Sequence, residues 1–267
     1  MTGDRELFSG TAKYYARHRP PYPAELIGGL AVTFGLGPGT GVLDLGCGSG
    51  QLALPLSRTG SVVWAVDPDP DMIAEGVREQ AEGGYGDVRW ILGRGEALRP
   101  AGLPGLRLCT MGASFHWMDR DLVLKTLDEM IEPDGGVALV SGSASVFSRS
   151  GAVEGAWLEV TREVITEFLG PRRRAGSGTY SHPKRGHEEV LLDSAFKRLE
   201  TSRFTCTRLL SVDDVVGLQL STSYASPAQL GERLPDFRAE LSRRLLELNP
   251  GEGFRTVEHT DLIVARR

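Results

Sequence analysis

The sequence has few cysteines, and their placement excludes two kinds of site. Cys47, Cys109 and Cys206 are the only three in 267 residues, and no two of them have Cys-x-x-Cys spacing. An odd number of widely separated cysteines indicates neither a disulfide framework nor a zinc site, and we expect no bound metal. The pattern fits a protein that works in a reducing compartment.

Long apolar runs are also missing. No stretch approaches the roughly 18 apolar residues that a membrane-spanning helix needs. The first residues, Met1-Thr2-Gly3-Asp4-Arg5-Glu6, are polar and lead into no apolar segment of the kind found in secretory signals. We therefore expect a cytoplasmic protein that does not associate with a membrane.

There is no excess of positive charge. Thirty Lys and Arg oppose 35 Asp and Glu, so the net charge is −5, which disfavours general binding to nucleic acid. The one basic cluster, Arg172-Arg173-Arg174, lies between Pro171 and Gly176. It is either a solvated loop or a clamp for an anionic substrate.

A glycine-rich stretch, Gly41-Val42-Leu43-Asp44-Leu45-Gly46-Cys47-Gly48-Ser49-Gly50, indicates a ligand site. An apolar run interrupted by Asp44 leads to three glycines at alternate positions, and a helical pattern begins at Gln51. Glycines have no Cβ, so a ligand can lie against the backbone, and the free N–H groups of the following helix face the same place. The stretch predicts a nucleoside-sized site. Gln51 occupies the position where a dinucleotide fold needs glycine, and no P-loop Gly-Lys-Ser or Gly-Lys-Thr is present.

A second apolar strand, residues 61–67, ends in Asp67. In a doubly wound sheet a carboxylate at this place accepts hydrogen bonds from the two ribose hydroxyls of a nucleoside. The alternative role for an aspartate here is to cap the next helix, which Asp69 or Asp71 can do instead. We therefore favour Asp67 as the ribose ligand.

Strands and helices alternate between residues 41 and 141, which predicts a parallel sheet built from βαβ units. After Gly142 the regular alternation of strands and helices ends, and the remainder of the chain begins with a long helix. The expected strands are 41–45, 61–67, 88–92, 106–111, 137–141, 196–206 and 258–265, and the expected helices are 24–34, 51–58, 71–81, 121–131, 152–169, one starting after Ser211 and one from Ser226 to Leu248.

Two further segments are candidates for chemistry. Gly112–Asp119 follows the fourth strand, and its His116 lies between Phe115 and Trp117. This histidine is a candidate general base with aromatic walls, or it orders the loop through a hydrogen bond. Residues 7–23 are rich in tyrosine and arginine, and they form either a helix that covers the core or a lid over the glycine turn.

Four motifs together resemble class I S-adenosylmethionine-dependent methyltransferases. Val42–Gly50 is similar to their first motif, Ala65–Asp67 to their second and Gly95–Leu98 to the turn after their third strand. Leu127–Gly136 is similar to the motif before strand five, although Asp134 replaces the first glycine of the usual Pro-Gly-Gly. Tyr15–Pro23 and Ser114–Trp117 further resemble the small-molecule branch (methyltransferase type 11) that includes trans-aconitate methyltransferase-like proteins.

The resemblance implies an α/β fold with a Rossmann-like, seven-stranded, mostly parallel sheet, helices on both faces and a partly helical cap. Its last strand is antiparallel and pairs with residues 196–206. The implied organisation is a pair of N-terminal lid helices (1–40), a cofactor-binding core (41–142), a cap insertion (143–195) and a C-terminal part that completes sheet and cap (196–267).

The resemblance also implies a reaction, in which S-adenosyl-L-methionine donates a methyl group to oxygen or nitrogen of a small metabolite and leaves as S-adenosyl-L-homocysteine. The metabolite would be, for example, a secondary metabolite or a carboxylic acid, and the enzyme a monomer or homodimer. Two alternatives are a catalytically silent binding or regulatory protein and, less favoured, an NAD(P)-dependent oxidoreductase.

Residue roles follow from the same resemblance. His116 is the candidate base, ahead of His18 and His182, although a base is optional. Asp44 orders the glycine loop or meets the amino group of the cofactor through water. The implied cofactor-binding residues are Tyr15, Arg19, Gly46, Cys47, Gly48, Gly50, Asp67, Pro68, Met72, Gly95, Glu96 and Met111, with the main chain near Arg94, and the implied substrate-binding residues are Tyr22, Trp117 and Tyr180.

Overall fold

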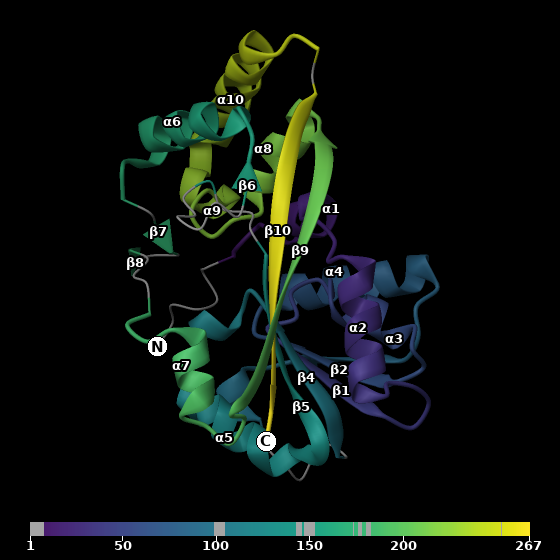
Figure 1. Cartoon of the computed structure of the whole chain (residues 1–267). Helices are drawn as coiled ribbons and strands as arrows, with labels where there is room; N and C mark the ends of the chain where they lie inside the picture. Colours follow the sequence, from purple (N-terminus) through teal and green to yellow (C-terminus); the bar gives the residue numbers. More distant parts are fainter. Residues whose placement is uncertain are drawn as a thin grey trace. The chain divides into compact units, whose positions relative to one another are not determined.

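A computed structural model describes residues 8–98, 105–142, 146, 153–172, 174–175, 178–179, 183–251 and 253–267. The chain divides into two compact units, drawn in Figure 1. The first comprises Met1–Pro20, Ser143–Ser181 and Thr205–His259, and the second comprises Pro21–Gly142, His182–Phe204 and Thr260–Arg267. The predicted four-part organisation of the chain stays a prediction.

The second unit is built on a parallel sheet. Its strands are β1 (Gly41–Leu45), β2 (Val62–Asp67), β3 (Val88–Leu92), β4 (Leu106–Gly112) and β5 (Ile131–Gly142), in the order β3-β2-β1-β4-β5. All four pairings between these strands are parallel. Residues 260–266 of β10 (Phe254–Arg266) then add to β5 in the antiparallel direction. The predicted parallel sheet with an antiparallel last strand is confirmed.

Helices cover both faces of this sheet because its strands are apolar on both sides. Successive β1 residues point to opposite faces, so Val42 packs in one apolar cluster while Leu43 and Leu45 pack in another. Figure 1 shows α2 and α3 on one side and α5 and α7 on the other. The helices are α2 (Ala24–Phe34), α3 (Ala53–Ser57), α4 (Pro70–Gly83), α5 (Arg120–Met130) and α7 (His187–Leu192), with short 3-10 turns η1 (Gly95–Ala97) and η3 (Phe115–Trp117).

The first unit is largely helical. It contains α1 (Ala12–His18), α6 (Trp157–Leu169), α8 (Val212–Leu220), α9 (Pro227–Leu230), the 3-10 turn η4 (Gly231–Arg233) and α10 (Leu234–Leu248), around a separate apolar cluster. Ser211 caps α8 and Ser226 caps α9, as predicted. The single helix expected from Ser226 to Leu248 is wrong. It breaks at Gly231, whose φ of 54° lies in the left-handed region that helices exclude.

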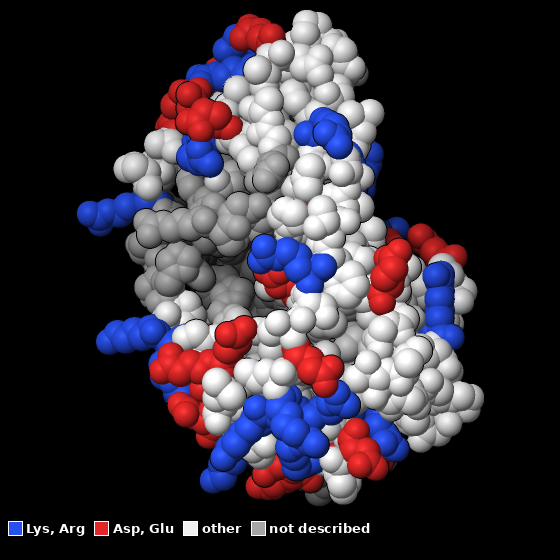
Figure 2. Space-filling view, viewed as in Figure 1, with Lys and Arg blue, Asp and Glu red and all other residues white. Residues whose placement is uncertain are grey.

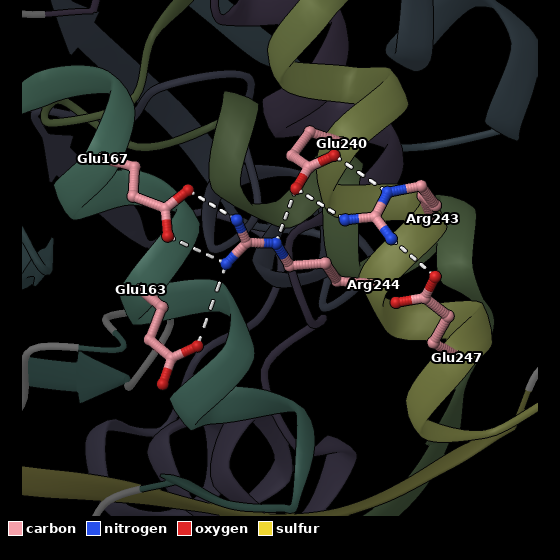
Figure 3. Close-up of polar contacts among 6 residues, drawn as sticks. All are labelled: Glu163, Glu167, Glu240, Arg243, Arg244 and Glu247. Carbon is pink, nitrogen blue, oxygen red and sulfur yellow. Dashed lines mark hydrogen bonds and ion pairs between the residues drawn. The ribbon is translucent and has the colours of Figure 1, made fainter.

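Ion pairs join α6 to α10 on the surface of this unit (Figure 3). The Arg244 guanidinium lies between Glu167 on α6, at 2.6 Å, and Glu240 on its own helix, also at 2.6 Å. Arg243 binds the same Glu240 at 2.8 Å, and the two guanidinium groups lower the pKa of Glu240 to about 2. The shared carboxylate therefore stays charged down to strongly acidic pH.

Long strands complete the sheet. β9 (Arg198–Leu210) pairs with β10, and β6 (Val153–Glu154) pairs with β10 at Val257 and Glu258. The described parts of the chain thus contribute eight strands to this sheet, and the two-residue β6 is the addition to the predicted seven. Two further short strands, β7 (Arg174–Ala175) and β8 (Gly178–Thr179), pair only with each other.

The face shown in Figure 2 carries charges of both signs next to each other. Near the C-terminal end of the chain, Arg267 pairs with Asp128 at 2.7 Å, and Arg203 pairs with Asp261 at 2.5 Å. Within the described residues, no helix is long and apolar enough to cross a bilayer, and no group of three or more His, Cys, Asp or Glu is arranged to hold a metal ion.

Candidate cofactor and acceptor site

The turn after β1 requires glycine for two reasons. Gly46, Gly48 and Gly50 have φ values of 65°, 54° and 91°, in the region that side chains disfavour. A Cβ on Gly46 would also lie 2.4 Å from Cβ of Ser114, which is far closer than two carbons can approach. The N–H groups of Gly46 and Cys47 both donate to the carbonyl oxygen of Val66, at 2.8 and 3.1 Å, so the turn is tied to β2.

Asp67 holds the turn from the end of β2. Its Oδ2 accepts the N–H of Gly48 at 2.8 Å and its Oδ1 accepts the N–H of Asp69 at 2.9 Å. Each carboxylate oxygen keeps a lone pair for a further donor. Burial raises the pKa of Asp67 to about 6, against the effect of the two backbone hydrogen bonds. Asp69 caps α4 by accepting the N–H of Asp71, so Asp67 is not needed as the cap.

Asp44 orders the other end of the turn. Its Oδ1 accepts the Thr110 hydroxyl at 2.7 Å and its Oδ2 accepts the N–H of Ala53, the first residue of α3, at 3.1 Å. This one side chain therefore links β1, β4 and the helix that follows the glycines. It is 1% exposed, and burial raises its pKa to about 7.

Cys47 does not supply a reactive thiolate. Its side chain is buried, and burial together with the neighbouring Asp44 and Asp67 charges raises its pKa well above the usual value. A protonated, enclosed thiol contributes packing to the turn.

Trp90 packs beneath the glycine turn and was not predicted to do so. A Cβ on Gly50 would lie 2.6 Å from the Trp90 ring, and one on Gly76 of α4 would lie 2.2 Å from it. The ring therefore rests directly on two backbone segments, and its Nε1 donates to Oε1 of Gln80 at 2.8 Å. Only glycine at both positions admits an indole this close.

The turn after β3 is tied to α5. Oε1 of Glu96 accepts the N–H of Asp119 at 2.8 Å, and Asp119 in turn caps α5 by accepting the N–H of Leu122. A Cβ on Gly95 would lie 3.2 Å from the Met118 sulfur. Of the other predicted cofactor residues, Met72 on α4 and Met111 on β4 are buried, and Pro68 is partly exposed beside Asp67.

The loop after β4 lies on the glycine turn. The Ser114 hydroxyl donates to the Leu45 carbonyl oxygen at 2.6 Å, and Cε of Met118 lies 3.2 Å from the place of a Cβ on Gly46. Ala113, just before them, has a φ of 51°, a strained conformation for a residue with a side chain. His116, between these two contacts, is partly exposed, and its ring lies 4.7 Å from that of Trp117.

The structure brings a second histidine to this loop, which the sequence analysis did not single out. His187, the first residue of α7, has its ring centroid 6.3 Å from that of His116 and 5.3 Å from that of Phe115. Its Nδ1 lies 3.5 Å from Nη1 of Arg120. Burial and the Arg120 charge lower the pKa of His187. No local motif marks this residue, because it lies 71 positions after His116 in the sequence.

The remaining predicted residues fall in different places. Tyr22 belongs to the unit that contains the sheet, and its hydroxyl lies 2.7 Å from the place of a Cβ on Gly112, at the end of β4. Arg19 belongs to the helical unit, where its Nε and Nη2 donate to Oγ and the carbonyl oxygen of Ser221, at 2.9 and 3.1 Å. The Arg19 guanidinium also stacks over the Tyr15 ring at 4.8 Å. Tyr180, His182 and Arg173 lie outside the described residues.

The chain is similar in sequence and fold to known methyltransferases. Residues 42–135, from β1 into β5, match the model of a methyltransferase domain. An uncharacterized methyltransferase of Mycobacterium tuberculosis is 26% identical over 245 residues, which cover 91% of this chain and 86% of the relative. A solved structure from Anaeromyxobacter dehalogenans, described as a type II methyltransferase, aligns with a TM-score of 0.63 and 24% identity over 93% of this chain and 97% of that one.

The chain contains a methyltransferase domain, and its fold is that of the class I S-adenosylmethionine-dependent methyltransferases. In this methyltransferase the matched domain contains the glycine turn, Asp67, Glu96 and the loop of His116, so the predicted family is confirmed. A ubiquinone biosynthesis O-methyltransferase of Azorhizobium caulinodans is 32% identical over 138 residues, half of this chain and 54% of that protein.

Proposed function

We propose that the methyltransferase moves a methyl group from S-adenosylmethionine to an oxygen or nitrogen atom of a small-molecule acceptor. The observation that carries the donor half is the buried Asp67 carboxylate, which is bound to the N–H of Gly48 and has a lone pair left on each oxygen. A vicinal pair of ribose hydroxyls matches that arrangement.

The sulfonium of the bound cofactor supplies an already activated methyl group, so the protein has to bind, orient and exclude water. Asp67 would hold the ribose, and the backbone of Gly46 and Gly48 would face the methionine portion. Met72, Gly95 and Glu96 would border the adenine, where Glu96 acts mainly by fixing the turn through its bond to Asp119. Tyr15 and Arg19 would close over the methionine end.

The proposed binding of the methyl acceptor is supported by the position of the loop after β4. Ser114 and Met118 flank His116 and touch the glycine turn, so the histidine lies close to where the methyl group would be presented. His116 would take the proton of a hydroxyl acceptor, with Tyr22, Trp117 and Tyr180 contacting the substrate. The partial likeness to a ubiquinone biosynthesis O-methyltransferase supports oxygen as the receiving atom.

Isothermal titration with S-adenosylhomocysteine tests the donor half. We expect one molecule bound per chain, and binding weakened at least tenfold by Asp67→Ala, which removes hydrogen bonds to a charged acceptor. Titration with NAD and NADP is the control for the oxidoreductase alternative. Binding of a dinucleotide but not of S-adenosylhomocysteine would overturn the proposal.

A second experiment distinguishes an enzyme from a silent binding protein. The methyltransferase is incubated with S-adenosylmethionine and panels of hydroxyl, amine and carboxylate compounds, and formation of S-adenosylhomocysteine is measured. We expect turnover with at least one class. If the acceptor is a hydroxyl, His116→Ala should lower kcat by roughly 100-fold or more, the usual contribution of a general base. If turnover is unchanged in this variant, His116 is not the base.

A further inference from the structure

We propose that His187 is a second acceptor-binding residue, and that His116, Trp117 and His187 together bind a planar aromatic hydroxyl compound that is methylated on oxygen. This inference rests on the proposed function and names its substrate class. The four rings of Phe115, His116, Trp117 and His187 come together from two separate segments of the chain. The segment that carries the first three rings contacts the glycine turn through Ser114 and Met118. Phe115 is buried, whereas the other three are partly exposed.

Arg120 determines the tautomer of His187. A guanidinium has N–H donors and no acceptor, so the imidazole Nδ1 that faces it at 3.5 Å is the unprotonated nitrogen. The proton of neutral His187 is then on the other ring nitrogen, Nε2. Burial and Arg120 both disfavour the charged imidazolium, which keeps this donor neutral at physiological pH. His187 can therefore donate a hydrogen bond from Nε2 to an acceptor oxygen without competing for its proton.

Arg120 itself is held in place. Its Nη1 donates to the carbonyl oxygen of Arg185 at 2.9 Å, and its guanidinium lies 5.9 Å from the Phe115 ring centroid. Arg185 is anchored by Asp121 and Asp193, at 3.2 and 2.6 Å. A fixed positive charge behind His187 favours an acceptor that becomes negative as it reacts. An aromatic hydroxyl does so when it loses its proton, whereas an amine does not.

The two histidines then have different roles. His116 accepts the hydroxyl proton, the oxygen lone pair forms the new O–CH3 bond, and the C–S bond of the sulfonium breaks with its electron pair remaining on sulfur. The products are the methyl ether, neutral thioether S-adenosylhomocysteine and protonated His116, which releases its proton to water. His187 holds the oxygen in line, and Trp117 stacks on the ring of the acceptor.

The test uses 4-nitrophenol, benzylamine and benzoate as probes of the full-length methyltransferase. Binding of each to the protein saturated with S-adenosylhomocysteine is measured by titration, and the ionisation of bound 4-nitrophenol by its visible absorbance. We expect 4-nitrophenol to bind at least tenfold more tightly than the other two probes, as the phenolate. His187→Phe should weaken this binding by fivefold or more and reduce the phenolate signal, with affinity for S-adenosylhomocysteine changed less than twofold.

His187→Gln, which keeps a hydrogen-bond donor, should recover part of the 4-nitrophenol affinity, and this separates the role in binding from a merely structural one. His259→Ala, a change at a partly exposed histidine whose Nδ1 lies 2.9 Å from the Thr205 hydroxyl, is the matched control and should have no effect. Thermal melts check that each variant is folded. Preferential binding of benzylamine or benzoate, or unchanged 4-nitrophenol binding in both His187 variants, would overturn the inference. Loss of S-adenosylhomocysteine binding in the wild type would instead overturn the proposed function.

Discussion

The backbone N–H of Gly48 donates a 2.8 Å hydrogen bond to Oδ2 of Asp67. This bond joins the glycine turn after β1 to the acidic end of β2, across 19 positions of sequence. The same carboxylate proposed to bind the ribose therefore also fixes the loop proposed to face the methionine portion. A change at Asp67 should weaken cofactor binding in two ways: a direct contact with the cofactor is lost, and the glycine turn becomes less ordered.

Asp67→Asn is expected to weaken S-adenosylhomocysteine binding by roughly 10- to 100-fold, because a hydrogen bond to a charged group contributes about 1.5–3 kcal/mol. The amide cannot accept from both backbone donors and both ribose hydroxyls. Isothermal titration measures the loss. Asp87→Asn, a change at an exposed aspartate that pairs with Arg89 at 3.4 Å, is the control and should bind normally. Equal affinities for wild type and Asp67→Asn would remove Asp67 from the site.

The affinity for S-adenosylhomocysteine should also depend on pH. The pKa of Asp67 is about 6 in the free protein, and ribose hydroxyls bind the carboxylate better than the carboxylic acid. Binding should therefore be strongest above pH 7 and weaken by up to about tenfold per pH unit below pH 6, as one linked proton requires. Titrations from pH 5 to pH 8 measure this. The slope should vanish in Asp67→Asn, and a slope that persists there would assign the proton to another group.

Alanine substitutions at Gly46 and Gly84 measure the stability cost of backbone strain separately from the cost of a steric clash. Gly46 and Gly84 have nearly the same φ, 65° and 61°, but only a Cβ on Gly46 meets a neighbour, Ser114 at 2.4 Å, since nothing lies within 4 Å of one on Gly84. Gly84→Ala should cost about 1–2 kcal/mol of unfolding free energy, the cost of a left-handed conformation. Gly46→Ala should cost roughly 1–3 kcal/mol more, the usual penalty of overpacking, and also reduce cofactor affinity. Urea unfolding and titration measure both. If the two variants are equally stable, the Ser114 contact does not restrict this position.

The buried Asp44 should make the protein less stable at high pH. Its pKa is raised from 3.8 to about 7, so the folded state holds a proton that the unfolded state has released, and stability falls as pH rises from about 4 to 7. Asp44→Asn removes this dependence, with an upper limit of about 4 kcal/mol from the size of the shift. Urea unfolding at pH 5 and pH 8 should give a smaller difference for Asp44→Asn than for wild type. Asp87→Asn should keep the wild-type difference, and an unchanged difference in Asp44→Asn would contradict the prediction.

The parts of the site that could be predicted from sequence are those determined locally. The glycines and Asp67 follow strands with clear apolar patterns, and a turn with positive φ at Gly46 requires glycine whatever else surrounds it. The break at Gly231 also had a local signal, since glycine followed by Pro235 interrupts the apolar periodicity of the predicted helix.

Other features depend on contacts between distant segments. Glu96 was assigned to the adenine from its place after β3, yet its carboxylate oxygen accepts the N–H of Asp119, 23 positions away. His187 approaches His116 only because α7 packs on the same face of the sheet as α5. The Trp90 ring fits against Gly50 and Gly76 only because α3 and α4 both lie over β3. None of these pairings follows from residue type or spacing.

A comparison of two ligands tests Arg19 as a predicted cofactor ligand. In its own unit it donates to Ser221 twice, at 2.9 and 3.1 Å, which docks the end of α1 on α8. If Arg19 also binds the carboxylate of the cofactor, Arg19→Ala should weaken S-adenosylhomocysteine binding by tenfold or more, because a charged hydrogen bond is lost. Methylthioadenosine, which lacks that carboxylate, should bind wild type and Arg19→Ala within twofold of each other. Arg17→Ala is the matched control, since Arg17 is exposed on the same helix and pairs with Asp213. Equal losses for both ligands in Arg19→Ala would mean that Arg19 only docks α1, and the role of α1 as a lid over the methionine end would then have to rest on Tyr15.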